Sequence, residues 1–199
     1  MDYGYIFDAD GVIVNTMEAH YLCNSIALGE AGVPMDKKQY FSQAGMTGRE
    51  QIRYFCQKAG KSFSEEQITK IYNRKRELYK LHVNSAEKIE SNTKLIEVLR
   101  AAGIPVAIAT GASRQSILPV LDRFGIIVDV IVTSDDVKRG KPNPDLFLLA
   151  AKRLGIQPRN CIVIEDSDAG IEAAEAAGMM AFRFYANKAT KQEKSAEGI

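Results

Sequence analysis

Short apolar runs recur along this chain and are separated by longer segments of mixed character. Five of them are continuous rather than alternating, as expected for strands buried on both faces of a sheet; they span residues 5–7, 105–109, 128–132, 161–164 and 180–184. Between the last four runs, apolar residues recur at helical spacing, as at Ile117, Leu121 and Phe124. This alternation predicts an α/β fold, in which a parallel sheet lies between two layers of helices.

The long segment between the first two strands contains no comparable strand pattern. Its apolar spacing predicts helices over residues 17–31, 48–59, 65–81 and 93–102. Two of these helices begin with a capping-box pattern, Thr47 before Glu50 and Ser64 before Gln67. The fourth ends just before a strand and is assigned to the sheet. We therefore predict a core formed by residues 1–14 and 86–199 and an inserted helical domain formed by residues 15–85, placed to act as a lid.

Composition and charge narrow the class of protein. The 199 residues are 46% hydrophobic and 26% charged, which is typical of a folded domain, and a formal net charge of +1 gives no reason to expect nucleic-acid binding. No stretch approaches the roughly 20 apolar residues of a membrane span, and residues 1–4 do not resemble the start of a signal peptide. We expect a cytoplasmic, monomeric protein without nucleic-acid or membrane partners.

The cysteine and histidine content limits the kinds of metal site. Three widely spaced cysteines, Cys23, Cys56 and Cys161, do not predict a disulfide framework. With only His20 and His82 available, a zinc site of the cysteine and histidine type is not expected either. A metal bound by this chain would therefore have oxygen ligands.

Charged and hydroxyl side chains follow four of the five predicted strands. They are Asp8 and Asp10 with Gly11 at the turn, Thr110 with Gly111, Lys141 between Gly140 and Pro142, and Glu165 with Asp166. Because the carboxyl ends of parallel strands meet at one edge of a sheet, we expect these groups to converge. Clustered carboxylates repel one another, and Mg²⁺ prefers a few carboxylates together with phosphate and water. The sequence therefore predicts Mg²⁺ on the acids, with Thr110 and Lys141 left to hold phosphate oxygens.

Each motif taken alone has an ordinary structural explanation. Asp-x-Asp is a common turn, Thr110 could cap a helix, and Glu165-Asp166 could complement a helix N-terminus. A Gly-Lys-Pro sequence is usually a surface turn. All four motifs come directly after predicted parallel strands, and this shared placement favours a single site over four coincidences.

In combination the four motifs resemble those of the haloacid dehalogenase-like superfamily. The helical insertion is similar to the cap of the subgroup that contains β-phosphoglucomutases, phosphoglycolate phosphatases and sugar-phosphate phosphatases. The resemblance implies a Rossmann-like core with a helical cap. It also implies that Asp8 is the nucleophile that forms an aspartyl-phosphate and that Asp10 is the general acid and base. The residues it implies for the remaining roles are Thr110, Gly111 and Lys141 for the phosphate, and Asp8, the Asp10 carbonyl, Glu165 and Asp166 for Mg²⁺.

The cap offers three candidate substrate residues. Thr16 and His20, one helical turn apart, match the pattern of β-phosphoglucomutases and related phosphatases, although a histidine packed at the domain boundary is an equal alternative. Arg49 could bind a distal anionic group of the substrate or be a solvated arginine. The chain departs from the family pattern at Asn15 and at Ser91-Asn92, where we expect altered hinge behaviour.

These observations predict a Mg²⁺-dependent phosphoric monoester hydrolase. We expect its substrate to be a small phosphorylated metabolite, such as a sugar phosphate. A β-phosphoglucomutase-like mutase is the first alternative. Such mutases carry a lysine in the cap loop just before the position of Arg49, whereas residues 44–48 here contain none, which favours the phosphatase. A non-catalytic protein that binds a phosphorylated metabolite is the second alternative, and the Asp8 and Asp10 pair argues against it.

Overall fold

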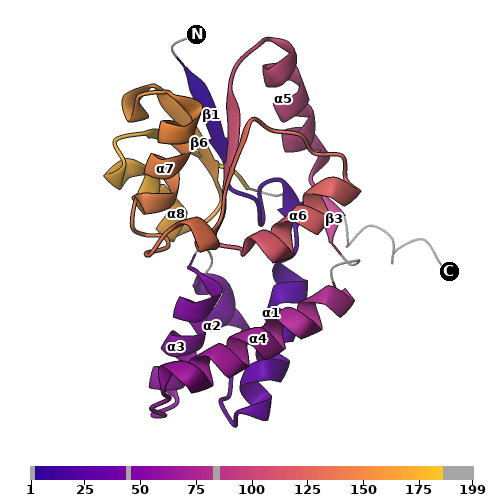
Figure 1. Cartoon of the computed structure of the whole chain (residues 1–199), viewed down its shortest axis with the longest axis vertical. Helices are drawn as coiled ribbons and strands as arrows, with labels where there is room; N and C mark the ends of the chain where they lie inside the picture. Colours follow the sequence, from indigo (N-terminus) through magenta and orange to yellow (C-terminus); the bar gives the residue numbers. More distant parts are fainter. Residues whose placement is uncertain (1–2, 44–45, 83–85, 186–199) are drawn as a thin grey trace, which may run out of the picture.

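The computed structural model describes residues 3–43, 46–82 and 86–185, which form a layered sheet with a group of helices at one end (Figure 1). Within these residues the main sheet has five parallel strands in the order β5-β4-β1-β6-β7. Their bounds are β1 Gly4–Phe7, β4 Val106–Ala109, β5 Val130–Val132, β6 Cys161–Glu165 and β7 Met180–Arg183. Each of the five apolar runs thus coincides with a strand to within two residues at either end, and the α/β class is confirmed.

Helices cover both faces of this sheet (Figure 1). They are α5 Glu90–Ala101 and α6 Arg114–Arg123 on one face, and α7 Asp145–Leu154 and α8 Asp168–Ala176 on the other. Successive residues of a strand point to opposite faces. Ile6 accordingly packs in the cluster formed with α7 and α8, whereas Phe7 packs in the cluster formed with α5 and α6. Burial on both faces explains why the inner strands β1, β4 and β6 are continuously apolar, whereas β7 at the edge of the sheet exposes Met180 and Phe182.

The remaining helices lie beyond the carboxyl ends of the strands (Figure 1). They are α1 Met17–Glu30, α2 Lys37–Ser42, α3 Gly48–Lys58 and α4 Glu65–His82, and they enclose a hydrophobic cluster of their own. Both predicted capping boxes form, at Thr47 with Glu50 and at Ser64 with Gln67. Helix α2 was not predicted, because six residues are too few to show a clear helical period; its start is capped by Asp36.

A small antiparallel pair connects the two groups of elements. Strands β2 Val14–Asn15 and β3 Glu87–Lys88 pair with each other, close to the predicted boundaries at 14/15 and 85/86. A side-chain hydrogen bond joins the same two chain segments, because Asn92 Nδ2 donates to the main-chain oxygen of Val12 at 2.8 Å. Two-residue strands have no readable alternation, so the sequence did not predict them. Helix α5 begins at Glu90, three residues before its predicted start, and therefore includes Asn92.

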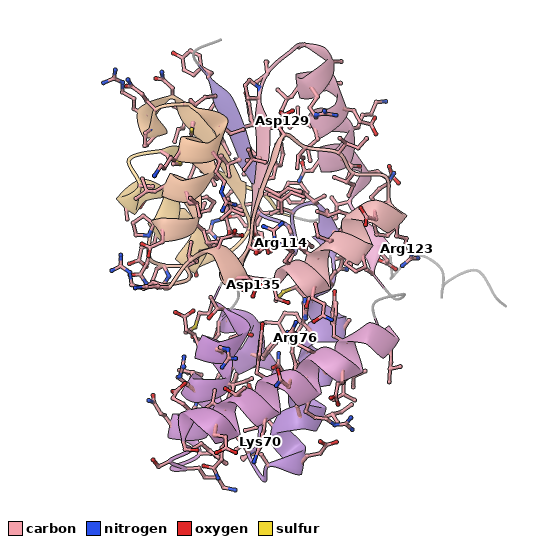
Figure 2. The ribbon with its side chains drawn as sticks, in the orientation of Figure 1. Lys70, Arg76, Arg114, Arg123, Asp129 and Asp135 are labelled. Carbon is pink, nitrogen blue, oxygen red and sulfur yellow. The ribbon has the colours of Figure 1, made fainter. Side chains whose placement is uncertain are left out.

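The helical cap and the core also meet directly. On the side shown in Figure 2, Arg76 of α4 faces the core near Arg114 and Asp135, and its guanidinium donates to Gln115 of α6. On the α3 side, the main-chain N–H of Gly140 in the core donates to Glu50 Oε1 at 3.4 Å. None of the helices in the described part of the chain is both long and apolar enough to cross a membrane.

Candidate active site

A tight turn after β1 positions the first pair of acids. The main-chain oxygen of Ala9 accepts hydrogen bonds from Ile13 and Val14, which folds the chain back beneath the cap. Gly11 occupies this turn with a φ of 84°, a conformation that favours glycine. A Cβ atom at Gly11 would lie 2.1 Å from Asp166 Oδ2. The glycine therefore both makes the turn and leaves room for the carboxylate of Asp166.

Lys141 links the acids at the ends of β1 and β6. Its Nζ donates to Asp8 Oδ1 and to Glu165 Oε1, each at 2.6 Å, and the side chain is fully buried. Burial alone would lower the pKa of this ammonium, but the two carboxylates outweigh it and raise the pKa of Lys141 above its ordinary value. Lys141 is thus a fixed positive charge directly beside Asp8.

Glu165 holds Lys141 in place. Its second oxygen, Oε2, accepts hydrogen bonds from the main-chain N–H of Ser167 at 2.6 Å and from the Ser167 hydroxyl at 3.0 Å. Burial raises the pKa of Glu165, but Lys141 and Ser167 bring it below its usual range. Gly170 leaves the space for this carboxylate, since a Cβ there would lie 1.9 Å from Oε1. Both oxygens of Glu165 are therefore already engaged within the protein.

For Asp8, Asp10 and Asp166, nearby positive charges do not offset the effect of burial on the pKa. Burial is the main reason that the pKa values are raised to about 6 for Asp8, about 7 for Asp10 and about 8 for Asp166. Repulsion between the acids adds to the effect for each of them. One carboxylate oxygen from each of Asp8, Glu165 and Asp166 lies within 4.8 Å of the others. A compact set of mutually repelling oxygens, from the buried Asp8 and Glu165 and the partly buried Asp166, fits a hard divalent cation such as Mg²⁺.

Thr110 and Gly111 follow β4 at the same edge of the sheet. Thr110 is buried, and its Oγ1 accepts a hydrogen bond from the main-chain N–H of Ala112 at 3.1 Å. The N-cap position of α6 is Ser113 rather than Thr110. Thr110 therefore does not cap this helix, and its hydroxyl proton is available to an anion.

A cavity of about 50 Å³ separates the cap from this edge of the sheet. Its core wall includes Asp8, Asp10, Thr110, Gly111 and Asp166. Its cap wall includes His20, Tyr40, Gln51 and Lys75. Lys141 and Glu165 do not line the cavity and lie beneath Asp8. The volume suits a few water molecules, so a phosphorylated metabolite requires the cap to move.

The cap brings His20 and Thr16 to this boundary. The ring of His20 stacks on Tyr79, with centroids 4.1 Å apart, and its Nε2 lies 3.8 Å from Asp10 Oδ2. Burial, with a contribution from Lys75, holds the pKa of His20 well below its ordinary value, so the imidazole is neutral and forms no ion pair with Asp10. Thr16 is buried at the N-cap position of α1 and does not line the cavity.

Lys75 is a residue that the sequence interpretation missed. It is 7% exposed, it lines the cavity, and the charge of Asp10 acts on it. Burial lowers the pKa of Lys75 to about 8, while Asp10 opposes this shift. The available signal was its position in the buried stripe of α4, which consists of Ile68, Ile71, Tyr72, Lys75, Leu78 and Tyr79. A lysine at a core position of an amphipathic helix requires a specific reason.

The third cap candidate, Arg49, packs against α4 and does not reach the cavity. Its Nη1 donates to the hydroxyl of Thr69 at 2.9 Å, and its guanidinium lies 4.8 Å from the ring centre of Tyr72. Both partners belong to α4, and Arg49 is not among the residues that line the cavity. Ala44 and Gly45, in the loop that lacks the mutase lysine, lie outside the described residues, whereas Met46 and Gly48 line the cavity.

Comparison with known proteins gives consistent matches over most of the chain. Hexitol phosphatase A of Escherichia coli strain K12 is 33% identical over 180 residues, covering 88% of this chain and 79% of that protein. The β-phosphoglucomutase of Bacillus subtilis strain 168 is 30% identical over 183 residues, covering 88% and 80%. A crystal structure of β-phosphoglucomutase from Clostridium difficile superposes with a TM-score of 0.82 at 30% identity, covering 91% of this chain and 83% of that one.

The family comparison agrees with the four motifs. The family model for haloacid dehalogenase-like hydrolases matches residues 4–178, which include every motif residue from Asp8 to Asp166. The relatives above carry names of both phosphatases and phosphomutases. The resemblance inferred from the sequence is confirmed, and this chain belongs to the haloacid dehalogenase-like hydrolase family.

Proposed function

We propose that this protein is a Mg²⁺-dependent phosphatase that hydrolyses a small phosphorylated metabolite, such as a sugar phosphate or similar monoester, through an aspartyl-phosphate. The observation that carries the proposal is the carboxylate of Asp8, which lines the cavity with Lys141 bonded to it at 2.6 Å. Phosphoryl transfer depends mainly on positioning and on neutralising charge. A buried carboxylate nucleophile beside a fixed ammonium meets both requirements.

In the first step, an Asp8 carboxylate oxygen forms a bond to phosphorus as the bond from phosphorus to the alcohol oxygen breaks. The leaving oxygen takes a proton from Asp10. The raised pKa of Asp10, about 7, keeps that proton available near neutral pH. Lys141, Thr110 and the main-chain N–H groups after β4 stabilise the negative charge on the transferring group.

In the second step, a water oxygen forms a bond to phosphorus and the bond to Asp8 breaks. Asp10, now a carboxylate, accepts the proton that the water loses. The products are the free alcohol and inorganic phosphate, and both aspartates return to their starting forms. The buried position of Asp8 limits access by bulk water until the alcohol has left.

For the metal, we propose Asp8 and Asp166 as carboxylate ligands, with the main-chain oxygen of Asp10 added from the family resemblance. Glu165 is the fourth acid named by the resemblance, and we assign it to holding Lys141 because both of its oxygens are engaged. When bound, Mg²⁺ supplies charge neutralisation for the acids and for the phosphoryl oxygens.

A phosphomutase is the second candidate, favoured by the β-phosphoglucomutase relatives. A mutase must bind two phosphate groups in turn and must protect the phospho-enzyme from water. Among the described residues of the cap that line the cavity, Lys75 is the only cation, and Met46 and Gly48 border the cavity on the loop side. This single cation supports the phosphatase over the mutase.

The decisive measurement is phosphate release from a panel of sugar and polyol phosphates with Mg²⁺ and without a bisphosphate activator. Free phosphate is expected; conversion of a sugar 1-phosphate to its 6-phosphate only after a sugar bisphosphate is added would support the mutase. Absence of turnover on the panel and on p-nitrophenyl phosphate, with and without the bisphosphate, would support a non-catalytic binding protein.

Asp8→Asn is expected to abolish turnover while preserving the fold, because an amide is a far poorer nucleophile than a carboxylate. Phosphate release and the far-ultraviolet circular dichroism spectrum should be measured on the same preparation. Retention of a substantial fraction of the wild-type rate by the folded variant would contradict the role of Asp8.

A further inference from the structure

Tyr40 of α2 brings a hydroxyl group into the cap wall of the cavity. Its side chain is 2% exposed and lines the space opposite Asp8 and Asp10. Its ring packs against Phe41 and Phe55, with centroid distances of 5.7 Å and 6.4 Å. The neighbouring rings therefore fix the direction of the Tyr40 hydroxyl.

Asn24 of α1 determines how that hydroxyl can bond. Its Nδ2 donates to the main-chain oxygen of His20 at 3.1 Å and to the hydroxyl oxygen of Tyr40 at 3.2 Å. Turning the amide over would place Asn24 Oδ1 against the carbonyl oxygen of His20, and two acceptors repel one another. The orientation of the amide is thus set by His20, and the Tyr40 oxygen is used as an acceptor.

This arrangement leaves the hydroxyl proton of Tyr40 without an acceptor among the described residues, since Asn24 is the one hydrogen-bond partner found for that hydroxyl there. Burial, as the main cause, together with the nearby charge of Asp10 raises the pKa of Tyr40, so the group remains a protonated donor. Buried donors nearly always have a partner. The cavity is the place from which a bound molecule can supply one.

In the proposed mechanism Lys141 and Thr110 hold the phosphoryl group from the core side, so that group is not the acceptor for Tyr40. Tyr40 belongs to the opposite wall of the cavity, where the part of the substrate that leaves as alcohol would lie. We infer that the Tyr40 hydroxyl, oriented by Asn24, donates a hydrogen bond to a hydroxyl oxygen of that alcohol and selects polyhydroxylated phosphate esters over alkyl ones. This inference rests on the proposed phosphatase function and assigns a specificity residue to it.

The test compares two esters that share a carbon chain and a phosphate and differ in their hydroxyl groups, a hexitol 6-phosphate and n-hexyl phosphate. Tyr40→Phe removes only the hydroxyl. It is expected to lower kcat/KM about three- to tenfold for the hexitol ester, as for loss of one neutral hydrogen bond, and less than twofold for the hexyl ester. Tyr54→Phe is the matched control, because the Tyr54 hydroxyl bonds to Gln39 in the cap and Tyr54 does not line the cavity.

Equal losses on both esters, or no loss on either, would overturn the inference. Wild-type activity on other monoesters but on neither of these two would also overturn it and would leave the phosphatase proposal intact. Failure of the wild-type protein to hydrolyse any monoester would overturn both. Thermal melting of the two variants shows whether a loss reflects unfolding, which would reduce activity on both esters alike.

Discussion

At the scale of single residues, the direction of a side chain determines whether a cation of the cap reaches the cavity, as Lys75 and Arg49 illustrate. Lys75 lies in the buried stripe of α4 and lines the cavity, whereas Arg49 bonds to Thr69 and stacks on Tyr72. Both are positively charged and both come from helices beside the cavity. Only Lys75 is placed to act on Asp10 or on a bound anion.

Lys75→Met is therefore expected to lower kcat/KM about ten- to a hundredfold, as for the loss of one charged hydrogen bond. Arg49→Met is the matched control and should change kcat/KM less than threefold. Because burial lowers the pKa of Lys75 to about 8, the ammonium is present below that pH and is lost above it. The wild-type rate should fall in two steps, one near pH 7 as Asp10 loses its proton and a second near pH 8 as Lys75 does. Lys75→Met should keep the first step and lack the second. Equal effects of the two variants on kcat/KM would contradict the role of Lys75 at the cavity.

At the scale of elements, the start of α3 makes a contact between the cap and the core segment that carries Lys141. The capping box of Thr47 and Glu50 packs on the main chain of Gly140, next to Lys141. A Cβ at Gly140 would lie 2.5 Å from Thr47 Cγ2 and 2.7 Å from Glu50 Oε2. The absence of a side chain at Gly140 therefore allows the cap to approach the core closely.

Gly140→Ala is expected to oppose this approach, at a cost of roughly 1–3 kcal/mol for overpacking, and to lower kcat/KM by about tenfold. Gly29→Ala in α1 is a suitable control, because no atom lies within 4 Å of a Cβ added there. That control should keep full activity and gain up to about 1 kcal/mol of stability from helix propensity. Steady-state kinetics and thermal melting measure both effects. Wild-type kinetics in Gly140→Ala would show that this contact has no role in turnover.

At the scale of the whole molecule, the charge of the acid cluster affects the stability of the fold. The pKa of Asp166 is raised to about 8 from an ordinary value of 3.8, mainly by burial. Its protonated form stabilises the fold below about pH 4, and this contribution is lost as the pH rises towards 8. Without a cation, the protein therefore carries the full electrostatic cost of the carboxylate above pH 8.

Asp166→Asn is expected to raise the melting temperature of the metal-free protein at pH 8, by about 2–4 °C for each kcal/mol regained. The gain should shrink towards pH 4, where the wild-type carboxyl is protonated. Mg²⁺ should raise the melting temperature of the wild type and have much less effect on the variant. Melting curves with chelator and with Mg²⁺ at both pH values test this. A variant that melts below the wild type in chelator at pH 8 would contradict the electrostatic explanation.

Most of the core could be predicted from the sequence because its signals are local. Continuous apolar runs identify the buried strands, and the motifs that follow them mark the edge where Asp8, Thr110 and Asp166 meet at the cavity. The pair β2–β3 and helix α2 could not be predicted, because two and six residues carry too little periodicity. Their positions depend on contacts between segments that are distant in the sequence.

The sequence by itself determined the α/β class, the family and the residue types at the strand ends, since each follows from a local pattern or a short motif. Only the tertiary structure decided the partners of those residues. In that structure Glu165 bonds to Lys141 and Ser167, and Arg49 packs on α4. Lys75 lines the cavity. The physical reason is that the rotation of a helix and the packing of the cap on the core determine which polar group is buried beside which charge, and these arise from contacts between the two parts of the molecule.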